Sequence, residues 1–481
     1  MLRKIIFVLT LLLFATLSTV LALAYFVEHF NRTPRELAPY IEHRSAGHNA
    51  TIVSLGNWVG KTLRSVDRME PLVAALPALK LGAQPLDLSQ PVGNIILVTS
   101  ADQARVAIAN ANPGDVITFS PGAYQFSGTD IFVNRAGRDD ARIIVRAEVP
   151  GTVKLQFSLL EGFHVTAPYW SFENLHIQGV CEVPGNCEHA FHVVANAHHF
   201  LARNNTIVDF NAHFKVNMSN QQIPDDGVIE YNSISNTDAR RTESSVTSLD
   251  LVAVSRWRIE HNLITDFIKA GSDKVSYGVF VKGGGNENRI ANNLIICEHH
   301  LRREMGQRVG LSFGGGGTGK AFCPDHQCVT EQDRGVIESN LVMACSDDGI
   351  YLNKAASSRI IKNTLIDTGG IEVRFAESTA DVEGNLVDGK IRSRDGGLIR
   401  ASENIDTNML SLFAGYHPVR NMFNDASMMD LRWRQRPPVK SSSTLGSNGT
   451  GELCDSKKSA KVIGAFDDFN ACLLSEPKKP N

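Results

Sequence analysis

The sequence lacks an excess of charge of either sign, and this lack excludes several classes of protein. Lys and Arg number 48 against 51 Asp and Glu, which leaves a formal net charge of -3 over 481 residues. A balance so close to zero gives no global field to attract nucleic acid, so we expect no nucleic-acid partner. Hydrophobic residues at 43% and charged residues at 21% exclude both a largely disordered chain and a multi-span membrane protein.

Motifs for nucleotides and metals are also lacking. Residues 314–321, GGGGTGKA, nearly match a phosphate-binding loop, but Ala321 replaces the Ser or Thr that would bind magnesium, and CPDHQC follows where a helix is required. We therefore expect no nucleotide. Six clustered histidines have no C-x-x-C or H-x-x-x-H spacing nearby, so we expect neither a metal site nor a cofactor. These histidines are His189, His192, His198, His199, His299 and His300.

The chain begins with an uncharged apolar run. Arg3 and Lys4 precede residues 5–27, which are about as long as the roughly 20 residues needed to span a bilayer. Ala22-Leu23-Ala24 is also an acceptable cleavage site, so residues 1–30 are either a membrane anchor or a signal peptide. In both cases the positive-inside rule places the rest of the chain outside the cytoplasm. We expect an exported, periplasmic protein, anchored in the inner membrane by residues 5–27 if these are not cleaved.

The eight cysteines fit such an export. An oxidising compartment permits disulfides, and an even count allows every cysteine to pair. Two pairs of cysteines bracket short Pro-containing turns, and a third pair lies alone near the C-terminus. In the fourth pair each cysteine follows the Asn of one of two consecutive repeats, which stacking could bring together. The predicted bridges are Cys181 to Cys187, Cys323 to Cys328, Cys454 to Cys472 and Cys297 to Cys345.

A short pattern recurs between about residues 90 and 405. It consists of an apolar β-branched residue, two variable residues, Asn, one residue and a further apolar residue, as in WRIEHNLI and GVIESNLV. Successive Asn residues are 27, 30, 31, 47, 23, 22 and 19 residues apart. Units this short cannot bury an apolar face alone, so they must stack into a solenoid. The Asn residues are Asn205, Asn232, Asn262, Asn293, Asn340, Asn363, Asn385 and Asn404.

Two solenoids carry an Asn in each repeat, the leucine-rich horseshoe and the parallel β-helix. A leucine-rich repeat requires Leu at fixed positions ahead of its Asn, whereas this chain has Val and Ile in short runs such as GVFV and GIYL. The β-helix therefore fits better. In it the Asn residues turn the chain between strands and stack as a ladder of amides along the axis, which is a structural role.

The start of the repeat region carries a resemblance. Residues 94–126 read as strand, amphipathic helix and strand, with Ala104, Ala107 and Ile108 at helical spacing for a cap over the first turn. Here PGD followed by a hydrophobic strand and PGAY resembles the right-handed parallel β-helix proteins of the pectate-lyase-like superfamily. The resemblance implies an all-β, right-handed parallel β-helix over residues 90–405 with an N-terminal helical cap. Residues 31–89 would be a helical linker and residues 406–481 a flexible, disulfide-tied segment.

One face of this β-helix could bind an acidic polysaccharide. Alternation along GVFVKGG turns Phe280 and Lys282 outward, and stacked strands place equivalent pairs beside them in two columns. Cations in such columns would meet carboxylates, and aromatic rings would stack on sugars. The alternative is an ordinary solvated face with scattered charges. The further residues of the columns are Tyr351, Asn353, Glu372, Arg374, Arg392 and Arg394.

A second resemblance suggests chemistry for Lys282. YGVFVKGGGNENRIANNLI is similar to the segment of polysaccharide lyase family 6, the alginate and chondroitin lyases, that carries the catalytic Lys. It implies that Lys282 removes the C5 proton of a uronate. The chain departs from that family at two places. Val275 and Tyr277 replace the two acidic residues that hold calcium in the family. The family also has an Arg in the next turn, and here Arg308 lies only near that position. Two functions therefore remain: β-elimination with Lys282 as base, or a non-catalytic, envelope-tethered β-helix that binds the polysaccharide or is structural.

Overall fold

The computed structural model describes residues 32–84, 93–302, 306–315, 317–440, 451–454 and 462–474, with scattered residues between 13 and 27. The predicted anchor or signal peptide, residues 1–30, lies largely outside the described residues. Among the helices of the described parts, none is long and apolar enough to cross a membrane.

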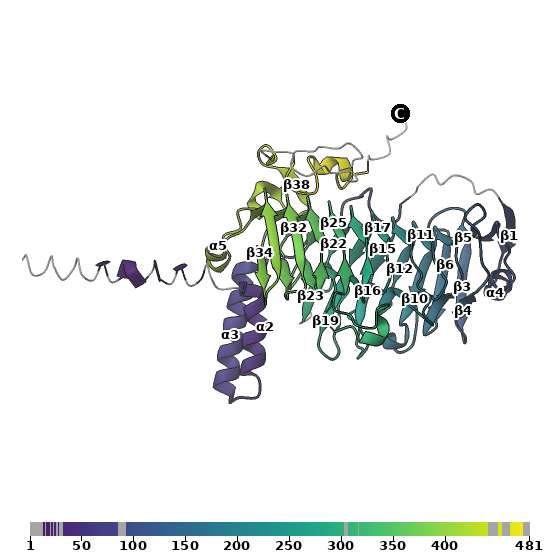
Figure 1. The fold of residues 1–481 in the computed structure, drawn as a ribbon, viewed down its shortest axis with the longest axis horizontal. Coiled ribbons are helices and arrows are strands. Elements are labelled where there is room, and N and C mark those ends of the chain that lie inside the picture. Colours follow the sequence, from purple (N-terminus) through teal and green to yellow (C-terminus); the bar gives the residue numbers. More distant parts are fainter. Residues whose placement is uncertain are drawn as a thin grey trace, which may run out of the picture.

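The chain coils into a parallel β-helix, as predicted (Figure 1). Each turn contributes one strand to each of three long sheets, and strands within these sheets pair in parallel. The twelve-stranded sheet contains β1 Asn94–Val98, β2 Asp115–Phe119, β5 Ile143–Ala147, β8 Trp170–Glu173, β11 Leu201–Arg203, β14 Val228–Glu230, β17 Arg258–Glu260, β21 Arg289–Ala291, β25 Val336–Glu338, β29 Ser358–Ile361, β32 Thr379–Glu383 and β35 Leu398–Ser402. 

The eleven-stranded sheet contains β3 Gly122–Ser127, β6 Val153–Ser158, β9 His176–Gly179, β12 Thr206–Val208, β15 Ser233–Ser235, β18 Leu263–Thr265, β22 Leu294–Ile296, β26 Leu341–Met343, β30 Thr364–Ile366, β33 Leu386–Val387 and β36 Ile405–Asp406. The ten-stranded sheet contains β4 Ile131–Val133, β7 Glu161–Val165, β10 His189–Val194, β13 Ala212–Asn217, β16 Val246–Val252, β19 Val275–Lys282, β23 Gln307–Phe313, β27 Ile350–Asn353, β31 Gly370–Arg374 and β34 Lys390–Arg394. Three short strands, β20 Gly285–Asn286, β24 Gln332–Asp333 and β28 Ala355–Ala356, form a small parallel sheet at one corner.

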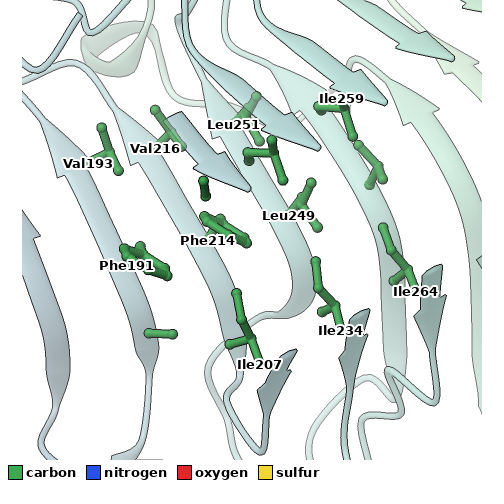
Figure 2. Close-up of a cluster of buried hydrophobic side chains, with 14 of the residues drawn as sticks. Phe191, Val193, Ile207, Phe214, Val216, Ile234, Leu249, Leu251, Ile259 and Ile264 are labelled. Carbon is green, nitrogen blue, oxygen red and sulfur yellow. The ribbon is translucent and has the colours of Figure 1, made fainter. Parts of the chain in front are cut away.

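The core consists of side chains that repeat from turn to turn (Figure 2). Phe191 of β10 stacks on Phe214 of β13 with ring centroids 5.0 Å apart, and Leu249 of β16 continues the same row. Ile207 and Ile234 lie opposite them on the eleven-stranded sheet. Each such side chain is completely or almost completely buried, which contributes about 1.5–3 kcal/mol apiece.

The predicted Asn ladder is present in full. The Nδ2 of each Asn donates to the Oδ1 of the Asn one turn later, at 2.9–3.0 Å, from Asn205 to Asn404. The residue before each ladder Asn has a positive φ, for example 57° at His261 and 53° at Ser339. Such a conformation costs a residue other than Gly about 1–2 kcal/mol. The ladder offsets this cost, because its amides donate to a backbone carbonyl two residues earlier and to a buried carbonyl of the preceding turn.

Caps cover both ends of the solenoid. Helix α4, Ala101–Ala109, buries Ala104 and Ile108 against the first turns, which confirms the predicted N-terminal cap (Figure 1). At the other end lies α5, Met409–Ala414, beside a hairpin of α2, Pro34–Ser45, and α3, Ala50–Asp67.

The buried Arg35 is one link between the helical hairpin and the β-helix. Arg35 of α2 donates to Asp67 Oδ2 at 2.6 Å, to the Cys345 carbonyl at 2.7 Å and to Asp367 Oδ1 at 3.1 Å. The helices of the expected linker therefore form part of the folded body, close to the strands that carry the predicted site.

The eleven-stranded sheet is covered on its outer side. Leu294, Leu341 and Leu386 point outward there and form a second apolar cluster with residues of segments 69–81 and 419–472. The antiparallel pair β37, Phe423–Asp425, and β38, Asp430–Trp433, belongs to this cover. All four predicted disulfides are present: Cys181–Cys187, Cys297–Cys345, Cys323–Cys328 and Cys454–Cys472.

Candidate functional site

The outward side chains of the ten-stranded sheet lie in two neighbouring columns, as the alternation of residues predicts. Paired residues on successive strands form the first column, and the residues two positions later form the second. The first column contains Phe280, Ser312, Tyr351, Glu372 and Arg392. The second contains Lys282, Asn353, Arg374 and Arg394. The predicted alignment is confirmed, while the roles of these residues stay predictions.

Lys282 is held in an ion pair. Its Nζ lies 3.3 Å from Oδ1 of the buried Asp250, and the Nζ of Lys215 lies 2.5 Å from Oδ2 of the same carboxylate. Burial would raise the pKa of Asp250, but the two ammonium groups outweigh burial and hold it below its ordinary value. A general base must be neutral, so Lys282 has to give up a proton and this ion pair before it can accept a substrate proton.

Phe280 points away from the core without reaching solvent. The ring is only 7% exposed, because Tyr277 stacks on it at 4.3 Å between centroids and the Lys282 ammonium lies 4.0 Å from its centre. Gly315 also packs on it, since a Cβ built there would lie 2.4 Å from a ring carbon. The alternation of residues predicts that Phe280 faces solvent. This expectation is wrong, because Tyr277 and Gly315 pack over the ring.

Tyr351, Asn353 and Arg374 are joined by hydrogen bonds. The Asn353 Nδ2 donates to the Tyr351 Oη at 3.0 Å, and the Arg374 Nη1 donates to the same oxygen at 3.5 Å. The Arg374 Nε donates to Asp395 at 2.6 Å. Asn353 is buried, whereas Tyr351 and Arg374 remain half-buried at the surface. Asn353 thus orients the phenol ring.

Arg392 and Glu372 are buried, contrary to the expectation of a solvent-facing column. The Arg392 guanidinium bonds Glu372 at 3.0 Å, Asp348 at 2.8 Å and Glu36 of α2 at 2.8 Å. Arg394 binds the other oxygen of Glu372 at 2.6 Å. The physical reason is the helical hairpin, which covers this end of the sheet and supplies Glu36. Arg392 therefore joins the hairpin to the sheet.

A cleft of about 1090 Å³ opens between α2 and the ten-stranded sheet. Four of the predicted residues line it: Tyr351, Glu372, Arg374 and Arg394. Lys282 and Phe280 lie beside it, connected to it by Tyr277, whose ring contacts Phe280 and also lines the cleft. The predicted residues of both columns therefore lie on one face of the sheet, but Lys282 lies outside the cleft.

Three carboxylates that the sequence did not single out meet in this cleft. One ligand oxygen from each of Glu36, Asp347 and Asp348 lies within 4.8 Å of the others, a set that suits a hard divalent cation. Burial, followed by the charge of Glu36, raises the pKa of Asp347 to about 7. Burial also raises the pKa of Asp348 well above its ordinary value, against the opposing effect of Arg392. The sequence signal for them was the pair Asp347-Asp348, separated from β27 by Gly349 alone.

The calcium site of polysaccharide lyase family 6 does not fit these residues. Val275 and Tyr277 stand where the resemblance requires acidic ligands and offer no carboxylate. Arg308 is 1% exposed and pairs with Glu298 at 3.6 Å, so it does not reach the cleft surface. No step through calcium at those positions follows from this structure.

Comparison with known proteins gives local similarity. No protein-family model matches the chain. Pectate lyase L of Dickeya dadantii (strain 3937) is 34% identical over 84 residues, and that of Dickeya chrysanthemi is 33% identical over 84 residues. Each match covers 15% of this chain and only 20% of the relative. The chain therefore matches about a fifth of the length of these curated relatives.

Solved structures show weak overall likeness. Pectate lyase Pel9A has a TM-score of 0.49 at 17% identity, covering 76% of this chain and 90% of that one. A rhamnogalacturonan lyase has a TM-score of 0.41 at 13% identity, covering 65% and 87%. The family 6 alginate lyase AlyGC has a TM-score of 0.32 at 12% identity, covering 80% and 59%.

Proposed function

We propose that the protein binds an acidic polysaccharide in the cleft under α2 and along the adjoining face of the ten-stranded sheet, and cleaves it by β-elimination outside the cytoplasm. The observation that carries this proposal is the pair Arg374 and Arg394, which occupy one column on adjacent strands and line the cleft beside Tyr351. Guanidinium groups suit carboxylates, and a phenol ring suits a sugar face. The name of the local relative, pectate lyase L, and the four disulfides support an exported protein that acts on such a polymer.

The predicted residues divide into three groups in this proposal. Arg374, Arg394 and Tyr351 contact the polymer. Lys282 is the base that takes the C5 proton, after which the bond from C4 to the leaving oxygen breaks, a C4–C5 double bond forms and the leaving oxygen is protonated by water. The positioning residues are Phe280, Asn353, Glu372 and Arg392, which hold Lys282, Tyr351, Arg394 and the hairpin in place.

The experiment incubates the purified chain with a panel of uronate polymers and follows the absorbance of new unsaturated ends, with binding measured in parallel. Lys282→Ala should lower elimination by about 100-fold or more while binding remains detectable, because the base is lost and the cleft arginines remain. Arg374→Ala should weaken binding, most strongly at low salt. Arg400→Ala is the matched control, since this exposed arginine pairs with Asp381 on the twelve-stranded sheet, outside the cleft lining.

Wild-type rates in Lys282→Ala would contradict its role as base. Unchanged binding in Arg374→Ala, or an equal loss in Arg400→Ala, would contradict the cleft as the binding site.

Non-catalytic binding is the second candidate function. It is favoured by the ion pair between Lys282 and Asp250, which has to break before Lys282 can act as a base. This function predicts that the chain binds the same polymers and that Arg374→Ala weakens the binding, but that no unsaturated ends form at any pH.

A further inference from the structure

Two neighbouring strands of the ten-stranded sheet carry the same triplet, Phe-His-Val. Strand β7 reads EGFHV and β10 reads HAFHVV, and their register pairs Phe163 with Phe191 and His164 with His192. The phenylalanines enter the core, so both histidines point outward on adjacent turns. Glu161, three residues before His164, completes a compact group at this face.

The three side chains converge on one point. The Glu161 Oε2 lies 2.7 Å from the His164 Nδ1 and 2.8 Å from the His192 Nδ1. One ligand atom from each lies within 4.8 Å of the others. Their side chains are 20%, 24% and 17% exposed, so the group is held by the protein yet open to solvent on one side.

Asn217 orients the imidazole ring of His192. Asn217 donates through Nδ2 to the Met218 carbonyl at 2.9 Å, which turns its Oδ1 toward the His192 Nε2 at 2.9 Å. A neutral His192 must then carry its proton on Nε2. Its Nδ1 lies 2.8 Å from the Glu161 carboxylate. In that tautomer the Nδ1 lone pair faces the carboxylate, an arrangement that a cation between them would stabilise.

We propose that Glu161, His164 and His192 bind a divalent transition-metal ion of the zinc class. Two imidazoles and one carboxylate are ligands that zinc prefers, and three protein ligands leave a coordination position open to solvent. Zinc lies about 2.0–2.2 Å from such ligands, so two ligand atoms of a tetrahedral site are about 3.3 Å apart. The Glu161 Oε2 is now 2.7 and 2.8 Å from the two Nδ1 atoms, and each of these distances would increase by about 0.5 Å on binding. Asn217 supplies the outer acceptor that orients a metal-bound imidazole.

The other histidine groups in the described part of the chain lack this arrangement. Asp266 also has two histidines beside it, but its Oδ1 accepts the backbone N–H groups of His299 and His300, and the His299 Nε2 bonds the Val73 carbonyl. His198 and His199 bond each other through Nδ1 at 2.8 Å.

The site shares the outward column with the candidate functional site. Register links His192 to Lys215, Asp250 and Phe280 on the next three strands, a distance of about 14 Å at roughly 4.8 Å per strand. A bound metal would add positive charge to the face that contains Lys282. The metal site stands independently of any polysaccharide cleavage.

The experiment strips the purified full chain with a chelator and titrates it with Zn²⁺ by calorimetry, then with Co²⁺ while recording visible absorption. One Zn²⁺ per chain should bind, and Co²⁺ should produce the absorption of a site with nitrogen ligands. Glu161→Gln and His164→Ala should each weaken Zn²⁺ binding by about 100-fold, and Asn217→Leu by about 10-fold. His199→Ala is the control and should bind as the wild type does.

Circular dichroism establishes that each variant is folded, and Glu161→Gln preserves the shape of the side chain if His164→Ala does not fold. Zinc binding that is equal in the wild type and Glu161→Gln, or absent from the wild type, would overturn the proposal and leave the contacts of Glu161 with His164 and His192 as purely structural ones. An equal loss in His199→Ala would overturn it too, because binding would then belong to scattered surface histidines.

Discussion

Replacing Asp347 by Asn should make the protein more stable at pH 8 and not at pH 4. The folded chain raises the pKa of Asp347 from 3.8 to about 7, through burial and the charge of Glu36. A raised pKa means that the folded state binds the proton more tightly than the unfolded state. The free energy of unfolding is therefore not reduced by Asp347 below about pH 4, and it falls as the pH rises through 7. Asn carries no charge and escapes this loss.

The magnitude follows from the size of the shift. A difference of about three pKa units corresponds to about 4 kcal/mol, and water in the cleft reduces it to about 2 kcal/mol because Asp347 is half-buried. Urea unfolding of the wild type and Asp347→Asn in metal-free buffer at pH 4, 6 and 8 measures the difference.

The matched control lies in the same cleft and should respond with the opposite sign. Burial would raise the pKa of Asp273, but the Val275 backbone N–H and Lys269 outweigh it and lower that pKa. Asp273→Asn should therefore lose stability at pH 8. A gain in Asp347→Asn that is the same at pH 4 and pH 8, or a loss at pH 8, would refute the reasoning.

Two further substitutions test the framework. Asn293→Ala should lower the free energy of unfolding by about 3 kcal/mol, because the buried Asn262 N–H and the Ile259 carbonyl lose their partner. Asn404→Ala, at the end of the ladder, should lower it by about 1 kcal/mol in the same urea unfolding assay. Equal losses would contradict the ladder. Arg392→Met leaves buried carboxylates without their cation. It should lower the stability measured by thermal unfolding by about 3–5 kcal/mol at pH 7 and by less at pH 5. A loss of stability that is independent of pH would contradict the ion-pair network.

Features that repeat along the chain could be predicted from the sequence. The ladder from Asn205 to Asn404 follows from spacing, because stacked turns bring equivalent residues together. The register of Tyr351 with Glu372 and of Asn353 with Arg374 follows from alternation within strands whose Gly residues align. Bridges such as Cys297–Cys345 depend on the same stacking.

The cover over the site could not be predicted in this way. Glu36 reaches Arg392 only because α2 packs on the last turns, and periodicity within the repeats contains no information on how a helix from outside them docks. For the same reason Arg392 was expected at the surface. The group around His164 and His192 had a signal, the repeated Phe-His-Val, which a search for helical histidine spacing does not detect.

The masses of the products released from uronate polymers test the proposed β-elimination most directly. β-Elimination leaves a new end that lacks one molecule of water relative to the product of hydrolysis. We expect the purified chain to release oligosaccharides with this lower mass, and Lys282→Ala to release almost none. Products with the full mass of hydrolysis, or the same dehydrated products at the same rate from Lys282→Ala, would contradict the account.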